Sequence, residues 1–401
     1  MRVLVYGYYD DFANFFLNVR NFHKAINKEA EYFFITPNIS GYLTWDDSNK
    51  YLIGSKFKFI KNKKSSYERS ILADINALSI LEGKDANDTI AQKKLDEIGD
   101  VFCKFVPDVV VISGDSRPNS RVVRFWADQR NIRMLYFEQG PKGTTLISPY
   151  GVTANHIAYS IDNEYSMPSV TPDLVTYNPN RWQRYLDVLQ MFSSDLESRF
   201  DLAMMLRKKN NKKPMKLTPA KNIKSRLLVV LQVPKDINSI FHGKFFSINQ
   251  LVIYLDKTVP KEVEIVFREH PMYRGSYDKS LYEYISNGDR LLLDSAEAGV
   301  PVRWGDYFSM ITVNSLMTFE AIDHGVPVAL LGRACYGGLA SNCEFHNDLK
   351  EFLLSTYKKD KSVPDSDEIE RYLKNTFLPG HYRSATKELL SNVAYRIEGT
   401  K

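Results

Sequence analysis

The chain has 401 residues, of which 44% are hydrophobic and 25% are charged, shares that are typical of a soluble globular protein. Its length exceeds what one hydrophobic core usually serves, so we expect two domains, and no apolar run approaches the roughly 20 residues of a membrane span. The net charge of +5 favours an anionic small molecule or a membrane surface as partner and argues against a nucleic-acid groove.

In chain order, the first half alternates strands with helices. An almost continuous apolar run at residues 108–114 is typical of a central parallel strand that is buried on both faces. Further strands are predicted at residues 2–7, 32–36, 57–60 and 134–138, and helices at 11–27, 68–81, 88–105 and 120–130. This repeat predicts a doubly wound sheet in an α/β fold.

A basic segment separates the two halves. Residues 178–209 have helical spacing, and residues 208–224 contain two prolines and no periodicity, which is typical of an interdomain linker. Contact of its lysines with anionic lipid or polysaccharide is the alternative interpretation.

The second half restarts the α/β pattern. Strands are predicted at residues 226–232, 263–271, 291–293, 311–313 and 328–331, and helices near 249–257, 278–286, 316–324, 368–376 and 385–398. We therefore predict an N-terminal Rossmann-like domain (1–207), the linker (208–224), a C-terminal Rossmann-like domain (225–380) and a C-terminal helix (381–401) that packs back across the junction. Two such domains that face a cleft form the GT-B architecture, among a few others.

Residues 311–332 are the most informative unit, because they read as strand, polar turn, short helix, glycine stop and strand. Asn314 and Ser315 can cap the helix, and their turn follows a parallel strand at its carboxyl end, where open α/β sheets bind ligands. We expect helix N–H groups there to accept an anion, and Glu320, about one turn inside, to reach a ribose diol. An ordinary strand–helix–strand connection is the alternative.

Two further segments of this half, residues 232–244 and 268–271, also follow predicted strands. Their candidate cations, donors and carboxylate are Lys235, His242, Arg268, His270 and Asp236. A nucleotide-sugar site needs donors for phosphate, an acid for ribose and a carboxylate near the reacting carbon. A lone histidine is more often structural, however, and Asp236 is equally well explained as a helix cap.

The first half contributes carboxylates and a loop with two glycine turns. Asp115 and Arg117 follow the central strand, and Glu138 follows the next one. We expect the loop at residues 140–152 to extend toward the same cleft, with a purely structural loop as the alternative. The polar side chains of this loop that we single out are Lys142, Thr144 and Thr145.

Several motifs with known chemistry are missing from the sequence. We find no Gly-x-Gly-x-x-Gly before a helix, no P-loop, no His/Cys/Asp cluster with metal spacing and no nucleophile elbow. The three cysteines (Cys103, Cys335 and Cys343) have neither a paired nor a metal-type spacing, which is typical of a reducing cytoplasm. These observations argue against a dehydrogenase, an NTPase, a metalloenzyme and an α/β-hydrolase.

Several motifs follow one another along the chain: Glu138-x-Gly140 followed by a Thr-Leu pair and Gly151-Val152, Gln232-Val-x-x-Asp236, His270-Pro271, Asn314-Ser315 with Glu320-Ala321, Gly325-x-Pro327-Val328 and Gly332-x-Ala334-x-Tyr336. Taken together, these motifs resemble those of the bacterial β-Kdo transferases of capsule and lipopolysaccharide assembly. The His-Pro pair also resembles the CMP-binding signature of GT-B sialyltransferases. Where the family has an aromatic residue and an arginine after Glu-x-Gly, this chain has Pro141 and Lys142, which leaves the acceptor contacts of that loop open.

The resemblance implies a GT-B fold, CMP-β-Kdo as the donor substrate, no cofactor or metal, and transfer with retention of configuration. It implies Asp236 as nucleophile, Glu138 or Asp115 as base, and His270 as the group that binds and protonates the leaving phosphate. The other implied donor contacts are Gln232, Lys235, His242, Arg268, Pro271, Asn314, Ser315, Glu320 and Tyr336. The implied acceptor contacts are Arg117, Lys142, Thr144 and Thr145.

The sequence leaves several alternatives open. The acceptor is a sugar residue of an O-polysaccharide, a Kdo oligomer or a glycolipid. Instead of a Kdo transferase, the protein could be another GT-B transferase for CMP-sialic acid or a UDP-sugar, or a non-catalytic polysaccharide-binding or export protein. We expect a cytoplasmic protein, with peripheral association at the inner membrane as an option, and either a whole protein or one module of a longer one.

Overall fold

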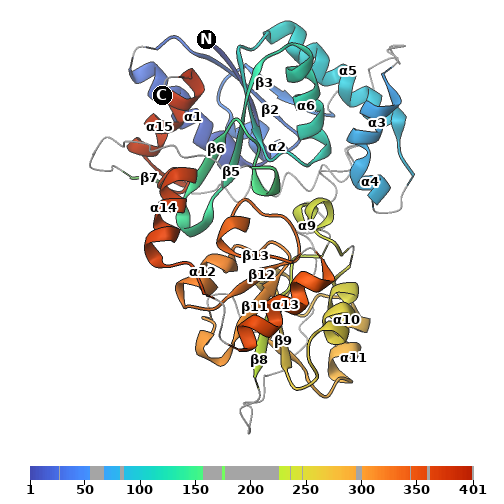
Figure 1. Cartoon of the computed structure of the whole chain (residues 1–401). Helices are drawn as coiled ribbons and strands as arrows, with labels where there is room; N and C mark the ends of the chain where they lie inside the picture. Colours follow the sequence, from blue (N-terminus) through green and yellow to red (C-terminus); the bar gives the residue numbers. More distant parts are fainter. Residues whose placement is uncertain are drawn as a thin grey trace. The chain divides into compact units, whose positions relative to one another are not determined.

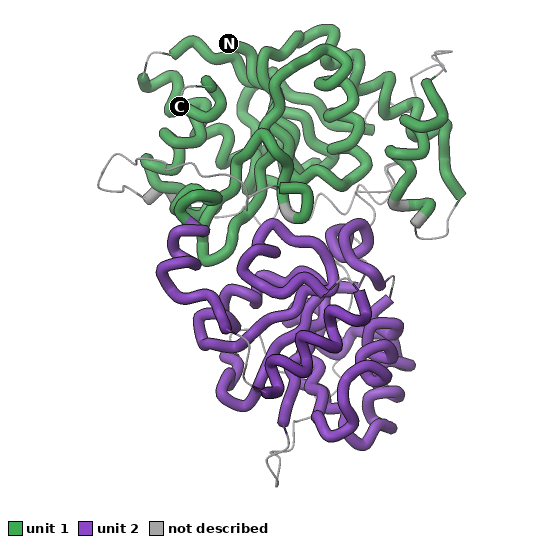
Figure 2. Tube along the Cα trace, viewed as in Figure 1, with its two compact units in different colours: residues 1–156, 162–207, 374–401 green, residues 157–161, 208–373 purple. Residues whose placement is uncertain are grey.

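The computed structural model of the chain is drawn in Figure 1. It describes residues 1–26, 28–54, 67–81, 85–156, 174–176, 225–234, 236–245, 247–294, 300–343, 345–358 and 362–399. The strand predicted at 57–60, the helix predicted at 178–209 and the linker predicted at 208–224 lie outside the described residues. The chain divides into two compact units (Figure 2). Unit 1 contains the described residues of 1–156, 174–176 and 374–399, and unit 2 contains those of 225–373.

Unit 1 is built on a six-stranded sheet with the order β3-β2-β1-β4-β5-β6. Its strands are β1 (Arg2–Tyr6), β2 (Glu31–Thr36), β3 (Lys50–Leu52), β4 (Val109–Ser113), β5 (Arg133–Gln139) and β6 (Thr145–Ser148). The first five strands are parallel, and β6 pairs antiparallel to β5 at the edge. All five residues of β4 are buried, because a central strand between two helical layers has no solvent face.

Helices cover both faces of this sheet (Figure 1). They are α1 (Asp10–Ala25), α2 (Ile39–Thr44), α3 (Arg69–Ile75), α4 (Ala77–Leu81), α5 (Asp88–Phe105), α6 (Pro118–Gln129) and α15 (Lys387–Glu398). α1 and α15 lie side by side, and α5 packs on α6. The core beneath α1 and α15 takes residues of five strands together with both helices, among them Val3, Val5, Tyr32, Phe34, Val109, Val111, Leu135, Phe137, Ile147, Phe12, Phe15, Phe16, Leu389, Leu390, Val393 and Ile397. A two-stranded antiparallel sheet, β7 (Leu174–Thr176) with β14 (Ser384–Thr386), completes the unit.

Unit 2 has a second six-stranded sheet, with the order β10-β9-β8-β11-β12-β13, and all of its pairs are parallel. Its strands are β8 (Arg226–Val230), β9 (Glu264–Arg268), β10 (Leu291–Asp294), β11 (Ser309–Thr312), β12 (Val328–Leu330) and β13 (Ser341–Asn342). Its helices are α9 (Ile237–His242), α10 (Ile248–Thr258), α11 (Lys279–Ser286), α12 (Met317–Asp323) and α13 (His346–Tyr357). Along the chain, α14 (Ser366–Thr376) leads from unit 2 back into unit 1.

The predicted fold class, two Rossmann-like doubly wound domains of the GT-B type, is confirmed by these two sheets. The loop predicted at residues 140–152 is wrong in part, because it folds as the short turn η1 (Pro141–Gly143) and the edge strand β6. No helix among the described residues is long and apolar enough to cross a membrane.

Candidate functional site

The candidate site of unit 2 lies at the carboxyl edge of its sheet. The strand order reverses between β8 and β11, and ligands of open α/β sheets bind in the crevice outside such a switch point. Gln232 follows β8, Asn314 and Ser315 follow β11, and His270 follows β9. The three segments selected from the sequence therefore share one edge of one sheet.

Gln232 joins the two strands at the switch point. Its side chain is 6% exposed, and its amide oxygen, in the orientation that its neighbours require, accepts the backbone N–H groups of Asn314 at 3.2 Å and Ser315 at 3.0 Å. The hydroxyl oxygen of Ser315 accepts the N–H of Met317 at 3.3 Å. The expectation that N–H groups of this turn hold an anion is therefore wrong for Asn314, Ser315 and Met317, because side chains of the protein already occupy theirs.

Asp236 is held at the start of α9, close to the same turn. It is the N-cap residue, and its half-buried carboxylate accepts the N–H of Asn238 at 3.1 Å. The side-chain amide of Asn314 donates to the carbonyl oxygen of Asn238 at 3.3 Å, which docks α9 on the turn after β11. At the other end of α9, Gly243 and Gly332 form a backbone bridge. A Cβ atom on Gly332 would lie 2.7 Å from the carbonyl oxygen of His242, so only glycine permits this close approach.

His242 lies at the other end of α9 from Asp236. It ends α9, six residues after the cap, which corresponds to about 9 Å along a helix axis. Its Nδ1 accepts a hydrogen bond from the guanidinium of Arg333 at 3.4 Å. Lys235, another predicted donor contact, lies outside the described residues.

A hydrogen bond to the backbone orients the ring of His270. Its Nδ1 accepts the N–H of Met272 at 3.3 Å at the start of the short turn η5 (Pro271–Tyr273). Burial lowers the pKa of His270, so its ring is neutral at neutral pH and carries its proton on Nε2. This N–H can donate to an anionic oxygen. Pro271 is exposed beside it.

Two residues that were expected to contact the donor are interior instead. Arg268 is 9% exposed, and its guanidinium donates to Asp294 and to the carbonyl oxygen of Val300, each at 2.6 Å. Tyr336 is 3% exposed and packs edge-on against Phe319, and burial raises its pKa well above the usual value. Both expectations are wrong, because sequence spacing does not reveal which side of a strand or turn a side chain takes.

Glu320, the predicted ribose ligand, lies on the exposed side of α12. Its carboxylate accepts a hydrogen bond from the indole N–H of Trp304 at 3.2 Å. Trp304 is buried and stacks on His324, with ring centroids 5.8 Å apart. The ribose contact stays a prediction.

Unit 1 has its own switch point between β1 and β4, and Asp115 follows β4 there. Asp115 is 5% exposed and accepts hydrogen bonds from Ser116 at 2.7 Å, from Val152 at 3.1 Å and from Asn155 at 3.0 Å. Glu138 is only half-buried, near the end of β5. Asp115 therefore fixes the loop after β6, whereas Glu138 keeps a side chain that solvent reaches.

The predicted acceptor residues divide into two groups. The hydroxyl of Thr144 donates to the carbonyl oxygen of Pro141 at 2.6 Å, and the fully buried Thr145 donates to that of Gly380 at 2.8 Å. The acceptor role of Thr145 is wrong, because its side chain is fully buried. The acceptor role of the half-buried Thr144 stays a prediction. Arg117 stacks over the ring of Tyr8 at 4.4 Å, and Lys142 is exposed.

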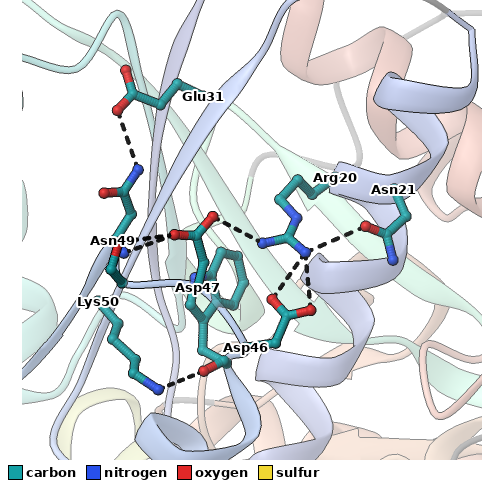
Figure 3. Close-up of polar contacts among 9 residues, drawn as sticks. Arg20, Asn21, Glu31, Asp46, Asp47, Asn49 and Lys50 are labelled. Carbon is teal, nitrogen blue, oxygen red and sulfur yellow. Dashed lines mark hydrogen bonds and ion pairs between the residues drawn. The ribbon is translucent and has the colours of Figure 1, made fainter.

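A separate hollow of about 730 Å³ lies at the opposite edge of the unit 1 sheet, where β1 and β2 begin. Figure 3 shows that the guanidinium of Arg20 is turned toward two aspartates there. Its side chain is 7% exposed and lies 2.9 Å from Asp46 and 3.3 Å from Asp47. The guanidinium of Arg20 is thus already paired with two carboxylates, so we do not place the candidate site in this hollow.

Comparison with known proteins identifies the family. Residues 174–380, just over half of the chain, match the family model described as capsule polysaccharide biosynthesis protein. The chain belongs to this family. The resemblance found in the sequence is thereby confirmed at the level of capsule biosynthesis.

Individual relatives of this capsule biosynthesis protein are distant. The capsule polysaccharide export protein KpsS of Escherichia coli is 23% identical over 64% of this chain and 74% of its own length. The capsule polysaccharide modification protein LipB of Neisseria meningitidis is 27% identical over 27% of this chain and 28% of its own length. Among solved structures, the Thermosulfurimonas dismutans KpsC β-Kdo 2,7 transferase has 13% identity and a TM-score of 0.39, with 76% of this chain and 89% of that chain covered. The UDP-GlcNAc 2-epimerase from Neisseria meningitidis has 13% identity and a TM-score of 0.36, with both chains fully covered.

Two features at the carboxyl edge of the unit 2 sheet were not predicted from the sequence of this capsule biosynthesis protein. Neither α9 nor the bridging amide of Gln232 was predicted, because a helix of six residues gives little periodicity. The two glycines that let α9 approach, Gly243 and Gly332, were a usable signal for a close backbone contact.

Proposed function

We propose that this capsule biosynthesis protein is a glycosyltransferase that moves Kdo from CMP-β-Kdo to a bacterial surface glycan or glycolipid, with retention and without a metal ion. The observation that carries the proposal is the convergence of Gln232, Asp236, His270 and the Asn314 turn at the switch point of unit 2. The family of the chain supplies the biological setting, and the motif resemblance supplies the donor.

At the donor, His270 has the properties that a leaving phosphate requires. Its neutral ring presents an Nε2–H group, which hydrogen-bonds a phosphate oxygen without having to lose a proton. The second pKa of a phosphate monoester is about 6. CMP therefore leaves readily as an anion, and a hydrogen bond that strengthens as charge develops suffices.

At the reacting carbon, we assign Asp236 as nucleophile. Its carboxylate oxygen attacks the anomeric carbon while the bond from that carbon to the phosphate oxygen breaks and CMP departs. A hydroxyl of the acceptor then attacks the same carbon, breaks the bond to Asp236 and gives its proton to a base. Two inversions amount to retention. The N–H of Asn238 on this carboxylate stabilises its ionised form.

We assign Glu138 rather than Asp115 as the base. Asp115 is buried and accepts three hydrogen bonds that hold its loop, so a proton on it would break that arrangement. Glu138 is half-buried and can exchange a proton with an acceptor.

The deciding experiment is brief mixing of the protein with CMP-Kdo, followed by assay of CMP release and by intact-protein mass spectrometry. We expect the mass of one Kdo on the protein and a peptide map that places it on Asp236. Asp236→Ala should reduce turnover by several orders of magnitude, because a nucleophile is lost. CMP-sialic acid and a UDP-sugar serve as control donors. Turnover with one of these and none with CMP-Kdo would show that this sugar nucleotide, and not CMP-Kdo, is the donor. An adduct on another residue would contradict the assignment of Asp236 as nucleophile.

A second candidate is a non-catalytic, polysaccharide-binding role in export. The name of the E. coli relative, capsule polysaccharide export protein, favours it. In that case the protein would bind capsule oligosaccharide, release no CMP from any donor, and bind equally well after Asp236→Ala.

A further inference from the structure

One buried tyrosine joins two strand ends of the candidate site. Tyr277 is 6% exposed and lies between η5 and α11. Its hydroxyl donates to the carbonyl oxygen of Gln232 at 3.1 Å and accepts the backbone N–H of His270 at 3.0 Å. The ladder between β8 and β9 ends just before this point, with the N–H of Leu231 on the carbonyl oxygen of Arg268 at 3.0 Å. The hydroxyl therefore stands between the strands where their own hydrogen bonds stop.

A second layer of hydrogen bonds holds Tyr277 itself. Its backbone N–H donates to the hydroxyl of Tyr282 at 3.2 Å. That hydroxyl donates to the carboxylate of Glu269, which is 3% exposed and also accepts the N–H of Gly275 at 3.0 Å. A buried carboxylate with such partners is costly to rearrange, so the segment from His270 to Tyr277 is fixed at both ends.

We propose that Tyr277 is a positioning residue, whose hydroxyl sets the separation between Gln232 and His270 and so holds the His270 ring at the carboxyl edge of the sheet. The consequence for CMP rests on the proposed function, whereas the placement of His270 does not. Without the hydroxyl, the N–H of His270 and the carbonyl oxygen of Gln232 both lose their partner. Water then enters between the strand ends, and the ring of His270 becomes more hydrated.

The test replaces Tyr277 by phenylalanine, which removes the hydroxyl and keeps the ring. NMR titration of the His270 ring in the free protein should show its pKa rising toward the usual value of about 6.5, because the ring is less buried. Calorimetry should show CMP binding weakened by about tenfold, the effect of losing the hydrogen bond from a displaced His270 ring to the phosphate. In a His270→Ala background, Tyr277→Phe should change CMP affinity by less than about twofold, because the residue through which Tyr277 acts is gone.

Tyr284→Phe is the matched control. Tyr284 lies on α11, and its hydroxyl donates to Asp256 at 2.9 Å, so this variant loses a tyrosine hydrogen bond away from the edge. It should leave both the His270 pKa and the CMP affinity unchanged. The proposal would be overturned if Tyr277→Phe left the His270 pKa unchanged and weakened CMP binding equally in the natural protein and in the His270→Ala variant. Tyr277 would then have a structural role only. If the natural protein binds no CMP, the donor assignment fails, and the His270 titration still decides the role of Tyr277.

Discussion

At the scale of single residues, the buried ion pair between Arg268 and Asp294 makes a clear prediction. Their side chains are 10% and 12% exposed, and their atoms lie 2.6 Å apart. Arg268→Met leaves a carboxylate in the interior without the guanidinium beside it, which costs about 3–5 kcal/mol of unfolding free energy. Urea unfolding should show this loss, and the double variant Arg268→Met with Asp294→Leu should recover most of it. If the Arg268→Met protein were as stable as the natural protein but bound CMP more weakly, Arg268 would contact the donor after all.

Residue identity at the edge was predictable, but residue roles were not. The polar residues after successive strands pointed to Gln232, His270 and Asn314, because side chains at carboxyl ends of parallel strands converge. The partner of each side chain was not visible, since it comes from distant sequence. Thr145 bonds to Gly380, and Tyr277 lies 45 positions from the carbonyl oxygen that it contacts.

At the scale of elements, the packing of α15 predicts sensitivity to acid. His23 of α1 is fully buried, with Nε2 3.3 Å from Glu398 of α15, and His156 is 4% exposed. Burial lowers the pKa of both, and Arg396 helps to lower that of His156 to about 4, while Glu398 opposes the shift of His23 only in part. The folded protein thus binds fewer protons than the unfolded chain, whose histidines titrate near 6.5.

The contribution of these two histidines to the free energy of unfolding should therefore be fully present above about pH 6.5. It should decrease as the pH falls toward 4, by up to about 1.4 kcal/mol per pH unit for each histidine. Urea unfolding at several pH values measures this slope. His156→Leu should flatten it, whereas His346→Gln, at an exposed position on α13, should not. An unchanged slope in His156→Leu would show that its burial has no such effect.

Long elements were predicted better than short ones. The helix expected at 88–105 is α5 (Asp88–Phe105), because its period is sustained over five turns and Asn87 caps it. The edge strand β6 has four residues, Thr-Leu-Ile-Ser, which show no alternation that would distinguish it from a loop. Its pairing depends on β5 and on Leu378, which sequence spacing does not show.

At the scale of the whole molecule, the two units differ in how the chain builds them. The described residues of unit 2 come from one continuous stretch, whereas unit 1 takes its last helix from the end of the chain. In α15, Leu389, Leu390, Val393 and Ile397 are at most 5% exposed. Removal of a large buried apolar side chain costs about 2–5 kcal/mol. The loss of all four is therefore comparable with the whole unfolding free energy of a typical domain, about 5–15 kcal/mol.

We therefore expect truncation after Thr376, which keeps α14 whole, to unfold unit 1 and to leave unit 2 folded. Hydrogen-exchange mass spectrometry distinguishes the units, because peptides from β1, β4 and β5 should lose protection while those from β8, β9 and β11 keep it. The control is a chain that ends after Gly399, where every described residue is present and both sets of peptides should stay protected. If β1 and β4 remain protected in the shorter chain, the contribution of α15 to the unit 1 core is smaller than its burial indicates. If β8 and β9 lose protection as well, unit 2 depends on residues beyond its own stretch, and the two units do not fold independently.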